Sequence, residues 1–262
     1  KKPSDFGFKI EEVKNNDGSS LPYMINRTMM RINLPEPLAP GNSFQFKIKW
    51  NYLINNSVKD GGRSGFELFP DGNKNYTIAQ FFPRLAVYDN VEGWQNMQFW
   101  GRSEWALEFG DYTVDITVPA DHVMQATGVL QNEKEVLTKK QQMRLAEAKK
   151  TYDKPVLIHT QDEAINAEKN RSKKTKTWKF YAENVRDYAF ASSRKFIWDA
   201  AGYKQDSKEN PLVMAMSFYP KEGEPLWSKY STEAVMHTMK VYSKYSFDYP
   251  YPTAQSVNGP VG

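Results

Sequence analysis

The chain has 262 residues, of which 40% are hydrophobic, 25% are charged and 14% are aromatic. This composition is ordinary for a soluble globular protein, and the length allows one large all-β domain or two smaller units, each with a real core. The formal net charge is only +4, which gives no argument for nucleic-acid binding. Because no cysteine is present, disulfides, thiol catalysis and cysteine-ligated metals are excluded.

The sequence shows no pattern of a membrane anchor or a leader. No stretch approaches the ~18 consecutive apolar residues that indicate a membrane-spanning helix, and Lys1 and Lys2 are not followed by the apolar run of a signal peptide. The chain does not begin with Met, so we interpret it as a mature protein or as a piece of a longer one. We expect a soluble protein, for which a bacterial cytoplasm, a periplasm and secretion all stay open.

Alternation of apolar and polar residues with a period of two is strongest over residues 43–54, where aromatic and aliphatic side chains alternate with Gln, Lys and Asn. This pattern predicts a strand with one buried face, and residues 23–34 are predicted to be its neighbour. Short strands separated by turn residues favour antiparallel sheets packed together. Further strands of this kind are predicted over residues 66–69, 76–82, 104–109, 112–118, 125–131, 156–160, 177–182 and 188–192.

One segment in the middle of the chain departs from the β pattern. Residues 137–150 have helix-forming composition but a thin apolar face, which predicts a surface helix. This helix would belong to a basic insertion over about residues 132–176. Acidic residues lie among its lysines and arginines, so the insertion is predicted to be a solvated excursion.

The last part of the chain departs from the pattern more strongly. Residues 210–219 form a near-continuous apolar run, which is typical of a strand buried on both faces. Pro225 then suits the first turn of a helix, and apolar residues recur at helical spacing to about residue 246. The sequence therefore predicts a β domain over residues 1–208 and the incomplete start of a second domain over residues 209–262.

A search of the sequence for catalytic patterns finds none. The three histidines are His122, His159 and His237, and no two of them have the four-residue spacing with which a zinc-binding helix presents its ligands. No serine lies in a Gly-x-Ser-x-Gly turn and no glycine-rich phosphate loop is present. Paired acids lie in polar stretches, where nothing would raise a carboxyl pKa. No residue of this chain is therefore predicted to be catalytic or to bind a metal or other cofactor.

Four segments, in order along the chain, resemble a known family. They are QFFPRLAVYDNVEGW (residues 80–94), FGDYTVDITVPADHVMQATG (109–128), ENVRDYAFASSRKFIWDA (183–200) and YSFDYPYPTAQSVNGPVG (245–262). Each is similar to a segment of the gluzincin aminopeptidases, which include aminopeptidase N and leukotriene hydrolase, and the likeness is nearest to their bacterial branch. The resemblance covers nearly the whole chain except residues 132–176.

The resemblance implies a mainly β fold. It would be an antiparallel, saddle-like β-sandwich followed by the first strand and helix of a truncated α+β, thermolysin-like domain. The parent protein would use zinc to remove N-terminal residues from peptides, and its His-Glu-x-x-His helix would lie beyond residue 262. The fragment would then be a hydrolase's non-catalytic N-terminal part, with a peptide substrate and the missing catalytic domain as its partners.

The resemblance also points to candidate substrate-binding residues. Family members place a glutamine of this domain at the wall that contacts the N-terminal residue of the substrate, and Gln80 matches it best. The alternative for Gln80 is a polar residue that merely ends a strand. Gly259, Pro260, Val261 and Gly262 would form a loop whose backbone lies along the substrate, since glycine permits close approach.

Two other functions stay open from the sequence. One is a free-standing β-sandwich that binds glycans or proteins through exposed aromatic side chains. The predicted strand and helix after residue 208 argue against it, because a binding module has no use for them. The other is a catalytically inactive relative of the peptidases that serves as an interaction scaffold.

Overall fold

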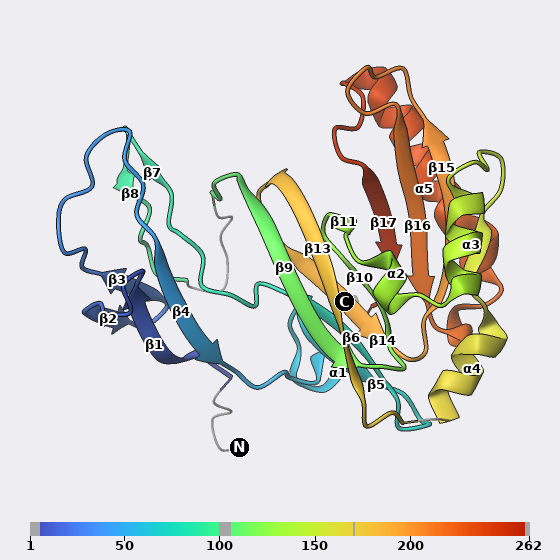
Figure 1. The fold of residues 1–262 in the computed structure, drawn as a ribbon, viewed down its shortest axis with the longest axis horizontal. Helices are drawn as coiled ribbons and strands as arrows, with labels where there is room; N and C mark the ends of the chain where they lie inside the picture. The colour runs from blue at the N-terminus through green and yellow to red at the C-terminus, as the bar shows by residue number, and fades with distance from the viewer. Residues whose placement is uncertain (1–5, 100–105, 170, 260–262) are drawn as a thin grey trace. The chain divides into compact units, whose positions relative to one another are not determined.

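The computed structural model describes residues 6–99, 106–169 and 171–259. The described chain is mainly β, and its strands pair antiparallel in every sheet except for one parallel pair, which confirms the predicted fold class. It divides into two compact units, Lys1–Asn55 with Pro83–Glu108 and Asn56–Phe82 with Phe109–Gly262 (Figure 1). The domain boundary predicted after residue 208 falls within the second unit and stays a prediction.

The described residues of the first unit form three two-stranded ribbons. The prediction of one long strand over residues 23–34 was wrong, because the chain reverses at Arg27, whose φ is 54°, and forms a hairpin. The apolar face predicted for residues 43–54 is only half-buried, and Phe46 is 41% exposed. The ribbons are β1 (Lys9–Asn15) with β4 (Phe46–Asn51), β2 (Tyr23–Asn26) with β3 (Met29–Ile32), and β7 (Tyr88–Asp89) with β8 (Gly93–Trp94).

The second unit contains three larger sheets. In the first, the strand order is β10 (Val123–Ala126), β14 (Ala189–Ser193), β6 (Lys74–Ala79) and β5 (Gly65–Leu68). In the second, it is β11 (Val129–Leu130), β13 (Thr175–Val185) and β9 (Gly110–Pro119). In the third, it is β12 (Val156–His159), β15 (Ile197–Lys204), β16 (Leu212–Tyr219) and β17 (Thr253–Val257).

The helices of the described chain all belong to the second unit. They are α1 (Ser57–Asp60), α2 (Glu133–Val136), α3 (Lys139–Ala148), α4 (Gln161–Lys169) and α5 (Leu226–Tyr245), with a 3-10 turn over Lys221–Gly223. None of the described helices is both long and apolar enough to cross a membrane.

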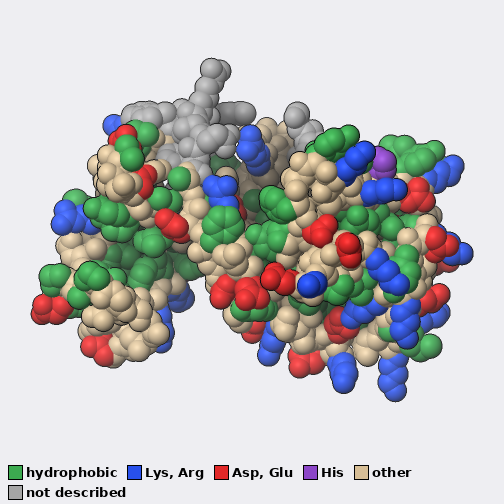
Figure 2. Space-filling view, turned by 90° about the horizontal axis from the view of Figure 1, so that it is seen from above, with side chains coloured by type: hydrophobic (Ala, Val, Ile, Leu, Met, Phe, Trp, Pro, Cys, Tyr) green, Lys and Arg blue, Asp and Glu red, His purple; other side chains and the backbone are tan. Residues whose placement is uncertain are grey.

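Figure 2 shows basic and acidic side chains interspersed on the face that it presents.

Side chains from all three sheets of the second unit share one apolar core. The alternation of β13 explains its part, since Trp178, Phe180 and Ala182 all point to the same face and are at most 3% exposed. Residues of β10, β12, β14, β15 and β16 also contribute to this core. The aromatic residues counted in the sequence therefore serve packing here.

β16 is buried on both faces, as its apolar run predicted. Met216 and Phe218 point into the shared core, whereas Val213 and Ala215 pack with Met239 of α5. In Figure 1, α5 lies along the sheet formed by β15, β16 and β17. The predicted helix after Pro225 is thus the crossover that joins β16 to its parallel neighbour β17.

The segment predicted as a solvated insertion contributes to the fold. Its helix α3 begins with a capping box, in which Thr138 and Gln141 exchange hydrogen bonds. Leu145 and Ala148 of α3 are buried against the shared core. The same segment supplies β12, the edge strand beside β15.

Gly128, which lies between β10 and β11, provides a test of the packing against the backbone of β13. Its φ is +90°, and a Cβ atom there would lie 2.2 Å from the carbonyl oxygen of Tyr181. We expect Gly128→Ala to lower the free energy of unfolding by at least about 1–3 kcal/mol, from the backbone strain alone. The measurement is urea unfolding followed by circular dichroism.

Gly110→Ala is the matched control for this prediction. A Cβ atom at Gly110 would have nothing within 4 Å, so this variant should unfold at the same urea concentration as the unmodified chain. Equal stability of the two variants would contradict the steric interpretation of Gly128.

Candidate functional site

Gln80 follows the last residue of β6, an inner strand held between β14 and β5. Its φ is 53°, an uncommon value for a residue other than glycine, and its side chain is exposed. The preceding residue, Ala79, donates its N–H to the Ser64 hydroxyl at 3.1 Å. The chain therefore turns the Gln80 side chain outward just after β6. The side-chain amide of Gln80 has no hydrogen-bond partner among the described residues.

Two phenylalanines fix the chain just after Gln80. The ring of Phe81 meets Phe190 edge-on at a centroid distance of 5.2 Å, and the ring of Phe82 meets Tyr112 at 5.8 Å. Tyr112 in turn stacks on the buried Tyr188 at 5.6 Å. Aromatic pairs of this geometry add to the stabilisation from burial. The position of Gln80 is thus set by β6 on one side and by this aromatic cluster on the other.

The C-terminal loop lies against the same strand. After β17, Asn258 donates its N–H to the carbonyl oxygen of Phe218 at 2.8 Å, which holds the loop on β16. A Cβ atom at Gly259 would lie 2.8 Å from Cγ2 of Thr77. Thr77 precedes Gln80 by three residues on β6. A side chain at Gly259 would force Thr77 to shift, and this close approach brings Gly259 to β6, the strand that precedes Gln80.

The structure places two of the five predicted substrate-binding residues. Gly259 lies against Thr77, which precedes Gln80 by three residues in the chain. Pro260, Val261 and Gly262 lie outside the described residues. What the described pair offers is an amide group and a backbone edge, which can bind and orient a polar ligand but cannot transfer a proton.

The histidines do not come together in the described structure. His122 is buried, and its Nδ1 lies 2.8 Å from the Ser192 hydroxyl. Burial, with a contribution from the Arg194 charge, lowers the pKa of His122 to about 4. His159 is also buried, and its Nδ1 lies 2.7 Å from the carbonyl oxygen of Phe196. His237 lies on the exposed side of α5.

One group of carboxylates has the spacing of a metal site. Asp71, Glu168 and Glu222 bring one oxygen each within 4.8 Å of one another. The Nζ atom of Lys195 lies among them, at 2.7 Å, 2.8 Å and 2.9 Å respectively. The group therefore already holds a cation, and Lys221 pairs with Glu168 beside it.

The Lys195 cluster is electrostatically matched despite its depth. Lys195 is 0% exposed, and burial disfavours its charge, yet the three carboxylate hydrogen bonds outweigh burial and hold its pKa above the ordinary value. The pKa of Asp71 falls to about 2, because the hydrogen bonds from Lys195 and Asn73 outweigh the burial of that carboxyl group. The described residues thus form a structural ion cluster and do not fit zinc, which favours His and Cys ligands.

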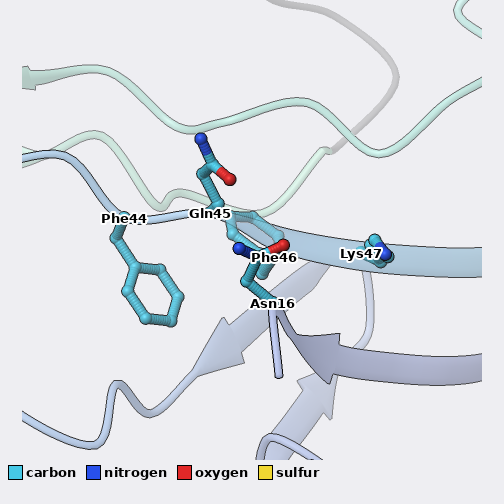
Figure 3. Close-up of a pocket in the computed structure, with 5 residues that line it drawn as sticks. All are labelled: Asn16, Phe44, Gln45, Phe46 and Lys47. Carbon is cyan, nitrogen blue, oxygen red and sulfur yellow. The ribbon is translucent and has the colours of Figure 1, made fainter. Parts of the chain in front are cut away.

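The first unit contributes a concavity at the start of β4, shown in Figure 3. Phe44 and Phe46 stack with their ring centroids 6.1 Å apart. The lining is completed by Asn16, Gln45 and Lys47. Lys47 is the single ionisable group of this lining, so the concavity holds no acid–base pair.

The sequence analysis missed two buried charged residues, Lys195 and Asp199. Both lie in the segment 195–203, which is otherwise apolar. A charged residue inside such a run is a usable signal, because a buried charge requires a partner. The identity of the partners was not readable from the sequence, since Asp71 lies 124 residues before Lys195.

Removal of the Lys195 ammonium group should destabilise the second unit. We expect Lys195→Met to lower the free energy of unfolding by about 3 kcal/mol, the low end for breaking a buried ion pair, because Asp71 and Glu222 are partly exposed. Urea unfolding at neutral pH measures this loss. The matched control is Lys149→Met, whose partner Glu133 lies at 3.2 Å on the surface; it should cost at most about 1 kcal/mol. Equal losses would show that the Lys195 cluster has no special role.

No protein-family model matches the chain, and no curated protein matches it. Among solved structures, it is similar to an M1 zinc metallopeptidase from Deinococcus radiodurans, with 15% sequence identity and a TM-score of 0.57, over 98% of this chain and 48% of that one. A variant of a two-domain M1 zinc metallopeptidase bound to L-tryptophan matches with a TM-score of 0.56 at the same identity and coverage. A Deinococcus radiodurans variant bound to a Tyr-Ser-Ala substrate matches with a TM-score of 0.55, again at 15% identity.

The chain therefore spans about half the length of the solved structures that it matches. At 15% identity the likeness is one of fold. The chain has the mainly β fold found in part of the M1 zinc metallopeptidases.

Proposed function

We propose that this chain is the non-catalytic N-terminal part of a zinc-dependent aminopeptidase, in which it forms a wall of the substrate cleft. The observation that carries the proposal is the share of each chain over which the two folds match. Nearly all of this chain, 98%, matches about half of a metallopeptidase chain, 48%. A free-standing binding module would have no reason to include the β16–α5–β17 crossover along with the other sheets.

The site geometry supports a role in substrate binding. Gln80 presents an amide without a partner among the described residues, and the loop at Gly259 lies beside the same strand. The similar structures bind L-tryptophan and Tyr-Ser-Ala, ligands that both carry a free α-amino group. We infer that the N-terminal residue of a peptide substrate contacts Gln80. The backbone of the peptide would run along residues 259–262.

Zinc belongs to the parent protein in this proposal. When bound to three protein ligands and a water, zinc activates the water for attack on a carbonyl group. The described residues offer no such ligand set, as the Lys195 cluster and the separated histidines show. The zinc ligands and the general base would lie in the polypeptide that follows residue 262, and the 262 residues alone would be inactive.

The decisive experiment reads the gene beyond residue 262. We expect a His-Glu-x-x-His helix within about 60 codons, zinc in the extended protein, and zinc-dependent hydrolysis of aminoacyl-4-nitroanilides. The 262-residue chain should bind no stoichiometric zinc and hydrolyse nothing. Loss of the zinc motif from the extended protein would favour the inactive scaffold, and turnover or stoichiometric zinc in the 262-residue chain would overturn the proposal.

The role of Gln80 is tested in the extended, active protein. We expect Gln80→Ala to lower kcat/KM about tenfold, the effect of losing roughly one hydrogen bond to the substrate. Gln161→Ala, at the exposed start of α4, is the matched control and should leave kcat/KM unchanged. Equal kinetics of the two variants would assign Gln80 to the mere end of a strand.

A further inference from the structure

A concavity of the second unit, which we call the β15–α5 concavity, has a lining rich in hydrogen-bond donors. Its volume is about 360 Å³. The side chains of two lysines, two tyrosines and a histidine in this lining can donate hydrogen bonds, and none of the described lining residues is an acid. The described lining consists of Tyr152, Gly202, Tyr203, Lys204, Met236, His237 and Lys240.

The concavity lies where β15 loses its neighbouring strand. β12 pairs with β15 only as far as Ala200, opposite Val156. Beyond this point, Gly202 donates its N–H to the carbonyl oxygen of Thr151 at 2.8 Å. Because the N–H groups of alternate residues in a strand point to the same edge, the N–H of Lys204 points to the edge that β12 leaves uncovered. A backbone donor therefore accompanies the side-chain donors.

Tyr152 and Lys204 form one wall of the β15–α5 concavity. A Cβ atom at Gly202 would lie 3.0 Å from Cε1 of Tyr152, so the tyrosine ring packs on the strand at the residue that has no side chain. Nζ of Lys204 lies 4.1 Å from the centroid of this ring, which is a cation–π contact. An aromatic ring, unlike a carboxylate, does not neutralise the charge of the ammonium group.

α5 supplies the opposite wall. His237 and Lys240 are three residues apart, which places them on the same side of the helix. Both side chains are exposed. Neither Lys204 nor Lys240 has an ion pair among the residues that the structure describes. Two positive charges from different elements therefore border the same concavity without a carboxylate between them.

Tyr203 joins the two walls. Its ring packs against the apolar cluster beneath α5, which includes Met239. Burial, with a contribution from the negative charge of Asp248, raises the pKa of Tyr203. The hydroxyl group of Tyr203 therefore stays protonated at neutral pH and remains a donor.

We propose that the β15–α5 concavity binds a phosphate monoester, with Lys204, His237 and Lys240 donating to the phosphate oxygens. Such a group carries a charge of about −1.5 to −2 at neutral pH and presents three acceptor oxygens. This charge matches the two ammonium groups, whereas a carboxylate would compensate only one of them. The volume lies at the low end of the range for small-molecule sites, roughly 300–1,000 Å³, so the organic group on the phosphate is small.

The test titrates the 262-residue chain with glycerol 3-phosphate at neutral pH and low ionic strength in a calorimeter. We expect saturable binding, which Lys240→Met should weaken about tenfold or more because it removes a charged hydrogen-bond donor. Lys240→Arg keeps a charged donor and should bind within about threefold of the unmodified chain. Lys229→Met, exposed on the same helix but outside the lining, is the matched control and should leave the affinity unchanged.

The same phosphate chemistry occurs in soluble metabolites and in the headgroup of phosphatidic acid, and a second measurement separates these sources. Sedimentation with phosphatidylcholine vesicles that contain phosphatidic acid should carry the chain down if the ligand is a lipid, and Lys240→Met should abolish this effect. Binding of glycerol 3-phosphate without binding to these vesicles would assign a soluble ligand.

Three results would overturn the site. One is the absence both of saturable heat with glycerol 3-phosphate up to about 10 mM and of vesicle binding. Another is acetate binding as tightly as glycerol 3-phosphate, since this would remove the match of charge. The third is an equal loss of binding in Lys229→Met and Lys240→Met, which would reduce the effect to the net charge of the chain.

Discussion

The burial of β16 on both faces is the constraint on which the second unit depends. Residues along Leu212–Tyr219 point alternately to the shared core and to α5. Each large apolar side chain moved from water to such a core contributes about 1.5–3 kcal/mol, so neither face of the strand can be left open. The core sheets therefore cover one face of β16 and α5 covers the other, and the strand needs both.

The position of the loop at Gly259 follows from this arrangement of β16. The parallel pairing of β16 with β17 fixes the path of the last strand, and Asn258 is held by Phe218 of β16. That path ends with Gly259 against Thr77, on a strand from the opposite end of the unit's sequence. A residue with a side chain at Gly259 would have to displace Thr77. The close approach of the loop to β6 is therefore a consequence of the sheet register and of the missing Cβ.

The features that the sequence predicts well are those with a strong local period. The apolar run of β16 and the helical spacing of α5 are local signals, and both correspond to elements of the structure. The hairpin within residues 23–34 was missed although three polar residues, 26–28, interrupt the apolar pattern, because a reversal with a positive φ at Arg27, which is not a glycine, has no strong sequence signal. A strand over residues 156–160 and a helix over residues 137–150 were predicted. Their role in the core was missed because the apolar face of the helix is thin, with Leu145 and Ala148 as its buried apolar residues.

The candidate site was predictable only in part. Gln80 and Gly259 were found through resemblance to a family, since neither residue carries a local chemical signal. The Lys195 cluster and the hydrogen bonds of Asp199 with Tyr219 and Thr232 depend on contacts between residues far apart in the sequence, and no spacing rule relates them. In each case the single signal in the sequence is a charged residue inside an otherwise apolar run.

The crossover between β16 and β17 also sets an order of assembly. The shared core can largely close over Met216 and Phe218 once β16 has formed, because its other buried residues precede β16 in the chain and only the partly buried Tyr251 and Val257 follow it. The opposite face, with Val213 and Ala215, must wait for α5 and for residues 253–257. An assembly intermediate with one finished and one bare side is therefore built into the order of the strands. Such an exposed apolar face is the kind of surface that chaperones bind and that aggregation exploits.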